Sequence, residues 1–297
     1  MSEPRATEVV APPRPPGRWL ALLWLALTTL LAMSTWFSGT AVVQPLRAEW
    51  ALSPAQGAWL TIAVQLGFVA GALGAAITNL LDIVPARSVL VASAIAAAMA
   101  NAGFGSSHGP AAALPWRCLT GVCLAGVYPT GLKLMATWFR EDRGRALGIM
   151  VGSLTLGSAA PHLVRGLGTF AWRDVVMATS WLTLAGAVVG LAFVREGPYP
   201  FPRARFDPSQ AGRVLRDRGV RLACVGYFGH MWELYAMWGW IAVFLGDRIA
   251  RDGHPDPPRA AVWAFAVIAA GFAGSWWAGA WSDRVGRTTS AALAMAV

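Results

Sequence analysis

Two ionisable side chains stand three residues apart in a long apolar stretch, and together they could exchange protons. Glu233 and His230 would lie about one turn apart on a helix, with Tyr227, Trp232 and Trp238 close to them in the sequence. Apolar and aromatic surroundings favour the neutral form of a carboxyl group, which would let it take up and release a proton near neutral pH. Two alternatives remain: structural pairing with a buried arginine, and direct contact with a bound molecule.

Arg117 and Tyr128 are the residues best suited to bind an anion. A guanidinium presents a rigid fork of donors to a carboxylate or phosphate. On a helix, Gly121, Leu124 and Tyr128 fall near the face that carries Arg117. The alternative is a structural arginine that pairs with helix carbonyls or with a carboxylate. Lys133, the only lysine in the chain, is expected to extend its ammonium group toward the nearer end of its helix.

Long apolar runs must position these side chains. The sequence is 56% hydrophobic and 13% charged, whereas a soluble domain has about 25% charged residues. A helix that crosses a bilayer needs about 20 apolar residues, and helices satisfy their own backbone groups in lipid. The sequence therefore predicts an all-α membrane protein. We place eight spans at residues 19–44, 56–80, 88–107, 111–137, 145–168, 174–194, 220–246 and 260–282.

A ninth apolar segment begins near Thr288 and reaches Val297 at the end of the sequence. Ten residues are too few to cross a bilayer. We therefore expect a six-span N-terminal half, residues 19–194, followed by a truncated C-terminal half, residues 220–297.

The basic residues predict an orientation rather than a nucleic-acid partner. The formal net charge is +9. If the N-terminus is cytoplasmic, 16 arginines fall on the cytoplasmic side and 6 on the other side. Such a bias follows the positive-inside rule. We expect a multi-pass protein of the cytoplasmic membrane with its N-terminus inside.

Two polar segments lie outside the predicted spans. Residues 1–18 are rich in proline and are expected to form a disordered cytoplasmic tail. Residues 195–219 are rich in arginine and proline, and are expected to link the two halves, with a short amphipathic helix at 209–218 on the membrane surface.

An acidic and basic turn occurs twice. Residues 279–287 read GAWSDRVGR after the eighth predicted span, and residues 78–87 read TNLLDIVPAR after the second. Asp283 and Asp82 are 201 residues apart. A turn that recurs after six spans indicates a duplicated six-helix unit, an arrangement typical of secondary transporters.

These residues resemble the major facilitator superfamily, in which G-x-L-x-D-R-x-G-R-R joins spans two and three and recurs between spans eight and nine. The second copy here matches through Gly279, Asp283, Arg284, Gly286 and Arg287, whereas the first keeps only Leu80, Asp82 and Arg87. Residues 117–121 are similar to the R-x-x-x-G motif of span four, and residues 128–131 are most similar to the nitrate/nitrite and small-anion porter branches.

The resemblance implies a secondary transporter that moves a small solute, with an anion slightly favoured, by alternating access. A proton or sodium ion gradient would drive it as a symporter, in contact with membrane lipid. The expected solute contacts are Arg117, Tyr128, Trp36, Gln65 and Trp238, and Glu233 with His230 would couple protons. The expected gating residues are Asp82, Arg87, Gly279, Asp283, Arg284, Gly286 and Arg287.

The alternatives to a transporter are a membrane-embedded enzyme or sensor and a truncated remnant. A membrane-embedded enzyme or sensor would need a convergent catalytic set or a signalling domain, and neither is visible in the sequence. A Gly-rich phosphate loop and metal-ligand spacings are also missing, so we expect no cofactor, no metal and no enzymatic activity. A truncated, non-functional remnant is the remaining alternative.

Overall fold

The computed structural model describes residues 15–200, 212, 216–251, 253 and 255–296. The predicted tail at 1–18 and the predicted surface helix at 209–218 therefore lie largely outside the described residues.

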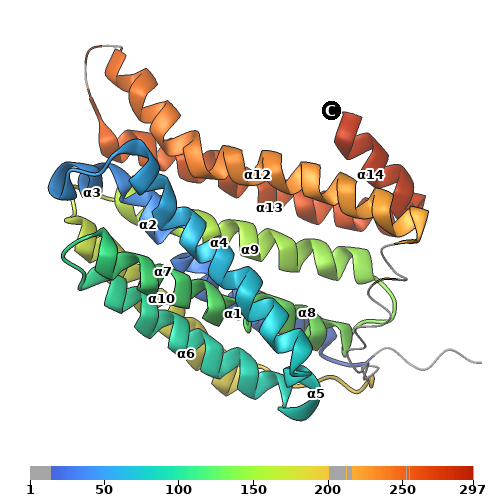
Figure 1. The fold of residues 1–297 in the computed structure, drawn as a ribbon. Helices are drawn as coiled ribbons and strands as arrows, with labels where there is room; N and C mark the ends of the chain where they lie inside the picture. Colours follow the sequence, from blue (N-terminus) through green and yellow to red (C-terminus); the bar gives the residue numbers. More distant parts are fainter. Residues whose placement is uncertain (1–14, 201–211, 213–215, 252, 254, 297) are drawn as a thin grey trace, which may run out of the picture.

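The described chain is all-α, as predicted, and the helices of the first half lie side by side (Figure 1). Within the described residues, seven helical segments are long and apolar enough to cross a membrane. Six of them belong to the first half: Arg18–Thr35, which contains α1 (Arg18–Ala32), α4 (Pro54–Ile77), α6 (Ala86–Gly105), α7 with α8 (Pro110–Leu124 and Tyr128–Ala136), α9 (Arg143–Gly166) and α10 (Trp172–Phe193).

The second half contributes α12 (Arg218–Arg251), α13 (Pro257–Val285) and α14 (Arg287–Ala296). The seventh apolar helix is α13, whereas α12 is not among the seven although it has 34 residues. His230, Glu233 and several Gly, Tyr and Trp residues make the predicted span 220–246 less apolar than the other spans. The ninth segment begins one residue earlier than predicted, at Arg287.

The first predicted span, residues 19–44, is wrong as a continuous helix. After α1 the chain forms the 3₁₀ turn η1 (Met33–Thr35), then α2 (Ser38–Ala41) and α3 (Val43–Trp50). Such a break frees backbone carbonyls that a regular helix would pair, and in an apolar interior they need other donors. Arg117 donates to two carbonyls of this segment, those of Thr35 and Trp36, and to the hydroxyl of Ser38.

The helices pack in pairs, and the pair of α13 and α9 joins the two halves. α13 lies along α9, α4 along α7 and α6 along α10, while α1 contacts both α9 and α10 (Figure 1). Glycines permit the closest approaches: a Cβ atom built on Gly121 would lie 1.9 Å from the carbonyl oxygen of Val64. Gly67 and Gly71 of α4 and Gly121 of α7 all lie at such close approaches between these two helices.

The two ends of the bundle are named here after their short helices, α3 and α5 (Leu80–Ile83) (Figure 1). At the α3 end, Glu49 accepts hydrogen bonds from the indole of Trp172 and from Arg173, the latter at 3.1 Å. The Trp172 hydrogen bond, followed by the Arg173 contacts, lowers the pKa of Glu49. At the α5 end, Arg18 pairs with Asp142 at 2.6 Å, which joins the start of α1 to the start of α9.

Candidate functional site

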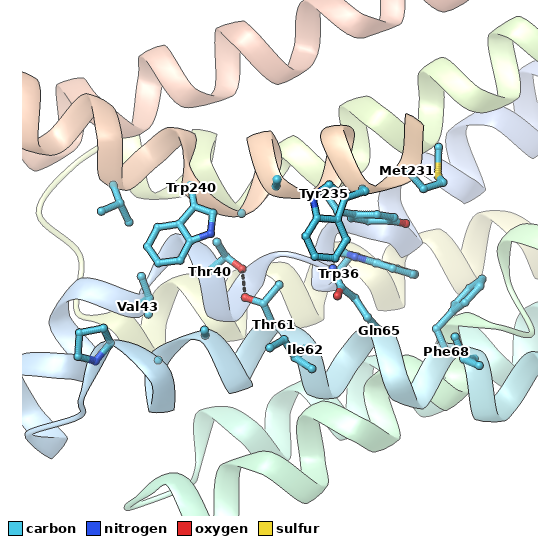
Figure 2. A pocket seen from close by; sticks show the side chains of 18 of the residues that line it. Trp36, Thr40, Val43, Thr61, Ile62, Gln65, Phe68, Met231, Tyr235 and Trp240 are labelled. Carbon is cyan, nitrogen blue, oxygen red and sulfur yellow. Dashed lines mark hydrogen bonds between the residues drawn. The ribbon is translucent and has the colours of Figure 1, made fainter. Parts of the chain in front are cut away.

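A cavity of about 700 Å³ lies between α4 of the first half and α12 of the second (Figure 2). Its remaining wall comes from the broken segment after α1 and from α3. The lining residues are Trp36, Thr40, Val43, Gln44, Arg47, Pro54, Gly57, Ala58, Thr61, Ile62, Gln65, Phe68, Val69, Tyr227, Phe228, Met231, Trp232, Tyr235, Ala236, Gly239, Trp240 and Val243.

The spacing of these residues explains how two helices form one cavity. The lining positions of α4 recur at intervals of three and four from Pro54 to Val69, and those of α12 do so from Phe228 to Val243. Each set forms one stripe of its helix. Because a helix rises about 1.5 Å per residue, the stripe on α4 is about 22 Å long, and the cavity is elongated.

Most of the lining is apolar, and several of its side chains are aromatic. Trp36 packs edge-on against Phe68, with ring centroids 4.9 Å apart, and stacks on Tyr235 at 6.2 Å. Figure 2 shows the ring of Tyr235 over Trp36, and Trp240 of α12 directed toward Thr40 and Val43. These rings therefore join the two halves across the cavity.

Few polar groups accompany the rings. Thr40 and Thr61 share a hydrogen bond of 2.6 Å, drawn in Figure 2. The indole Nε1 of Trp36 is buried without a hydrogen-bond partner among the described residues. Of the residues that line the cavity, Arg47 alone carries a charged side chain.

Arg117 is fully buried and lies behind the cavity wall rather than in it. Its guanidinium donates to the carbonyls of Trp36 at 2.7 Å, Thr35 at 3.1 Å and Leu60 at 3.1 Å. It also donates to Ser38 Oγ at 2.9 Å and Asn101 Oδ1 at 3.3 Å. All of these acceptors are neutral groups, so the geometry corresponds to the structural alternative for this arginine.

The hydrogen bonds continue from Arg117 into α6 and α10. Ser38 donates to Asn101 Oδ1 at 2.7 Å, and the Asn101 amide donates to Val176, Thr179 and Ser180. The broken segment after α1 is thereby tied to three other helices. This network binds the backbone carbonyl of Trp36, whose side chain lines the cavity.

The predicted solute contacts fall into two groups. Trp36 and Gln65 line the cavity, whereas Arg117, Tyr128 and Trp238 do not. Trp238 is 4% exposed and packs edge-on against Phe37 at 5.6 Å. The roles of all five in solute binding stay predictions.

The predicted proton-coupling pair, Glu233 and His230, is exposed on α12 and does not line the cavity. Glu233 is not among the hydrogen-bond partners of Arg117 in the described structure. The alternative that Glu233 pairs with Arg117 is therefore not supported. The predicted role of Glu233 and His230 in proton coupling stays a prediction.

Several lining residues were not singled out from the sequence. Arg47 is among the six arginines that the predicted orientation places on the external side, and the sequence predicts no role for Thr61 or Phe68. The intervals of three and four in residues 54–69 would have identified the α4 stripe. The position of Arg47 depends on the break in the first span, which the apolar composition conceals.

The first copy of the predicted gating turn forms ionic contacts at the α5 end. Asp82 pairs with Lys133 at 3.0 Å, and the same ammonium donates to the carbonyl of Leu81 at 2.6 Å. Arg87 donates to the carbonyl of Leu191. The turn after α4 is therefore joined to α8 and α10. Lys133 is held by protein groups rather than extended freely past the end of its helix.

The second copy of the turn joins the two halves. Both carboxylate oxygens of Asp283 accept hydrogen bonds from backbone amides at the start of α9, from Gly144 at 2.8 Å and from Arg145 at 2.9 Å. A carboxylate at a helix N-terminus is stabilised by the free N–H groups and the helix dipole. Gly279 makes a close backbone contact with Gly144, and Gly286 ends α13 with a φ of 91°. Arg284 and Arg287 are exposed.

Comparisons with known proteins agree with this architecture. The chain is similar to the crystal structure of a bacterial homolog to the human lysosomal transporter Spinster, in an inward-facing and unoccupied conformation, with a TM-score of 0.57 and 16% sequence identity. The alignment covers 96% of this chain and 80% of that chain, and shows a shared fold. No curated protein gives a significant match. The sequence model of the Major Facilitator Superfamily matches residues 24–297. The chain therefore belongs to the major facilitator superfamily.

Proposed function

We propose that this protein carries a small solute across the cytoplasmic membrane by alternating access, with the cavity between α4 and α12 as the solute site. The observation that carries the proposal is that both halves of the chain contribute to one cavity of about 700 Å³. Cavities of this size enclose small organic molecules. Movement of one half against the other would open such a site to either side of the membrane.

The α5 end supplies contacts that such a movement would break and remake. Asp283 on α13 binds the start of α9, so these hydrogen bonds cross between the halves. The pair of Asp82 and Lys133 stays within the first half. We assign the Asp283 contact to closure of the α5 end, and the Asp82 contact to fixing the turn between α4 and α6. With the N-terminus inside, as the 16-to-6 distribution of basic residues favours, the α5 end faces the cytoplasm.

Alternating access is tested by labelling from each side of the membrane. Cys118, Cys123 and Cys224 are first replaced by serine, and Gln65→Cys then places one thiol in the cavity. We expect a membrane-impermeant maleimide to label this thiol from either side of oriented vesicles. Leu73→Cys is the control, because Leu73 is on α4 and exposed but outside the cavity. Labelling of the Gln65→Cys thiol from one side only, under every condition tried, would contradict alternating access.

We further propose that Glu233, with His230, couples transport to protons. Within the stretch of α12 that lines the cavity, residues 227–243, Glu233 is the only carboxylate. A change in its charge would act on the helix that forms one wall of the cavity. Because maleimide reacts with the thiolate, the labelling rate at Gln65→Cys is divided at each pH by the rate of the same thiol in the unfolded protein. We expect this ratio to change with pH, and Glu233→Gln to flatten the change. Asp247→Asn, on the same helix but beyond the cavity, is the matched control. An unchanged profile in Glu233→Gln would leave a sodium ion as the coupling ion to test.

A further inference from the structure

We propose that the cavity between α4 and α12 binds an elongated aromatic monoanion whose charged group is held by Arg47 at the α3 end. This inference rests on the proposed function and names the class of solute. It follows from three properties of the lining: its charge, its length and the distribution of its polar groups.

The charge of the lining favours an anion. Arg47 is the only charged residue that the described chain contributes to the cavity, and no carboxylate accompanies it. Its Nε lies 3.5 Å from the carbonyl of Leu52, a long contact, and its two Nη groups have no hydrogen-bond partner among the described residues. A free guanidinium edge binds a carboxylate, phosphate or sulfonate through paired hydrogen bonds. A cationic solute would meet the arginine without a balancing acid.

Two other cations of the first half, Arg117 and Lys133, are already engaged. Arg117 donates to five protein acceptors, three of them backbone carbonyls. Lys133 is bound to Asp82 and to the carbonyl of Leu81. The anion preference that the sequence analysis attached to Arg117 is therefore assigned here to Arg47.

The polar groups of the cavity gather toward Arg47. Thr40, Gln44 and Thr61 line the part of the cavity nearest α3 together with the one charged side chain, whereas Gln65 lies between the two ends and Phe68, Tyr227 and Phe228 line the opposite part. The side chain of Arg47 packs over Gly57: a Cβ atom added to Gly57 would lie 3.4 Å from Cδ of Arg47. The cavity is thus amphipathic along its length of about 22 Å.

The walls suit flat rings. Trp36, Tyr235 and Trp240 face the α4 stripe in Figure 2, and Trp36 is fixed by ring contacts with Phe68 and Tyr235. Aromatic side chains bind other aromatic rings by stacked or edge-on packing. An aromatic body between these rings, with its anionic end on Arg47, would fill the cavity and satisfy its charge.

The test uses three probes that share one body and differ in charge: biphenyl-4-carboxylate, biphenyl-4-methanol and biphenyl-4-methylammonium. Binding to the purified protein in phosphatidylcholine nanodiscs is measured by equilibrium dialysis of radiolabelled probe, with empty nanodiscs as the partition blank. We expect the carboxylate to bind about tenfold or more tightly than the alcohol, and the ammonium probe to bind most weakly.

Variants then assign the charged group. Arg47→Gln should weaken binding of the carboxylate about tenfold to a hundredfold and leave binding of the alcohol unchanged, because only the anion uses the guanidinium. Arg47→Lys should recover part of the loss, since the positive charge remains. Arg165→Gln is the matched control, because Arg165 donates to the carbonyl of Phe170 and does not line the cavity.

Several outcomes would overturn the inference. Equal binding of the three probes, tightest binding of the ammonium probe, or an equal loss in Arg165→Gln would each remove Arg47 as the anion site. A membrane lipid is the competing occupant, so the measurement is repeated in nanodiscs that contain phosphatidylglycerol. Loss of carboxylate binding there would assign the site to a lipid headgroup. The binding measurement does not depend on transport. If the probes fail to bind as expected, the labelling test of alternating access is unaffected.

Discussion

Replacement of Arg117 by leucine should destabilise the protein by about 3 kcal/mol. The guanidinium donates five hydrogen bonds from a fully buried position, and a hydrogen bond in a membrane protein contributes on average about 0.6 kcal/mol. The carbonyls of Thr35 and Trp36 belong to the broken segment and would lose this donor. Arg117→Leu should therefore disorder the wall of the cavity that carries Trp36.

The stability is measured by thermal unfolding of the purified protein in detergent, in parallel with probe binding. Arg117→Lys retains the charge but offers three donors without the planar fork, so it should fall between the wild type and Arg117→Leu. Arg165→Gln, at a half-buried arginine with one hydrogen bond to a backbone carbonyl, should change stability by about 1 kcal/mol or less. A loss of solute binding or uptake at unchanged stability would instead show that Arg117 contacts the solute directly, the reading favoured by the sequence alone.

The sequence predicts the fold well because each span is specified locally. A run of about 20 apolar residues without charge has few stable alternatives to a membrane helix. The acidic and basic turns at Asp82 and Asp283 are 201 residues apart and follow the second and the eighth span. A repeated six-helix unit is the simplest explanation of this spacing. The family and the all-α class could accordingly be predicted from the sequence alone.

The site was harder to predict because it depends on contacts between distant segments. The break at residues 33–42 is stabilised by Arg117, which is about 80 residues away in the chain, and nothing in the local composition marks it. The break moves Arg47 from an expected external loop to the cavity wall. Burial inside an apolar run was also assumed for Glu233, whereas the face of α12 that carries it is exposed.

Replacement of Gly279 by valine should open the α5 end by separating α13 from α9. A Cβ atom on Gly279 would lie 2.4 Å from the carbonyl oxygen of Gly144 and 3.0 Å from Cα of Gly148, both backbone atoms that cannot turn aside. Overpacking of this kind costs about 1–3 kcal/mol. If the cost falls on the closed arrangement alone, the ratio of open to closed forms rises about five- to 150-fold.

The opening is measured by double electron–electron resonance between spin labels at Leu147 on α9 and Val285 on α13, both exposed. We expect the distance distribution of Gly279→Val to gain a longer component. Gly274→Val is the matched control, because Gly274 lies on the same helix and a Cβ atom added there would have no neighbouring atom within 4 Å. Identical distributions in the two variants would show that this glycine contact does not hold the α5 end closed.

A second change at the same contact separates steric from electrostatic closure. Asp283→Asn keeps the shape of the side chain but removes the charge that faces the backbone amides of Gly144 and Arg145. A carboxylate at a helix N-terminus contributes about 0.3–1 kcal/mol, so this variant alone should lengthen the distances less than Gly279→Val does. Once valine has separated the helices, the carboxylate no longer reaches the amides, and the double variant should match Gly279→Val. Additive effects would instead mean that Asp283 acts on a step other than the contact between α9 and α13.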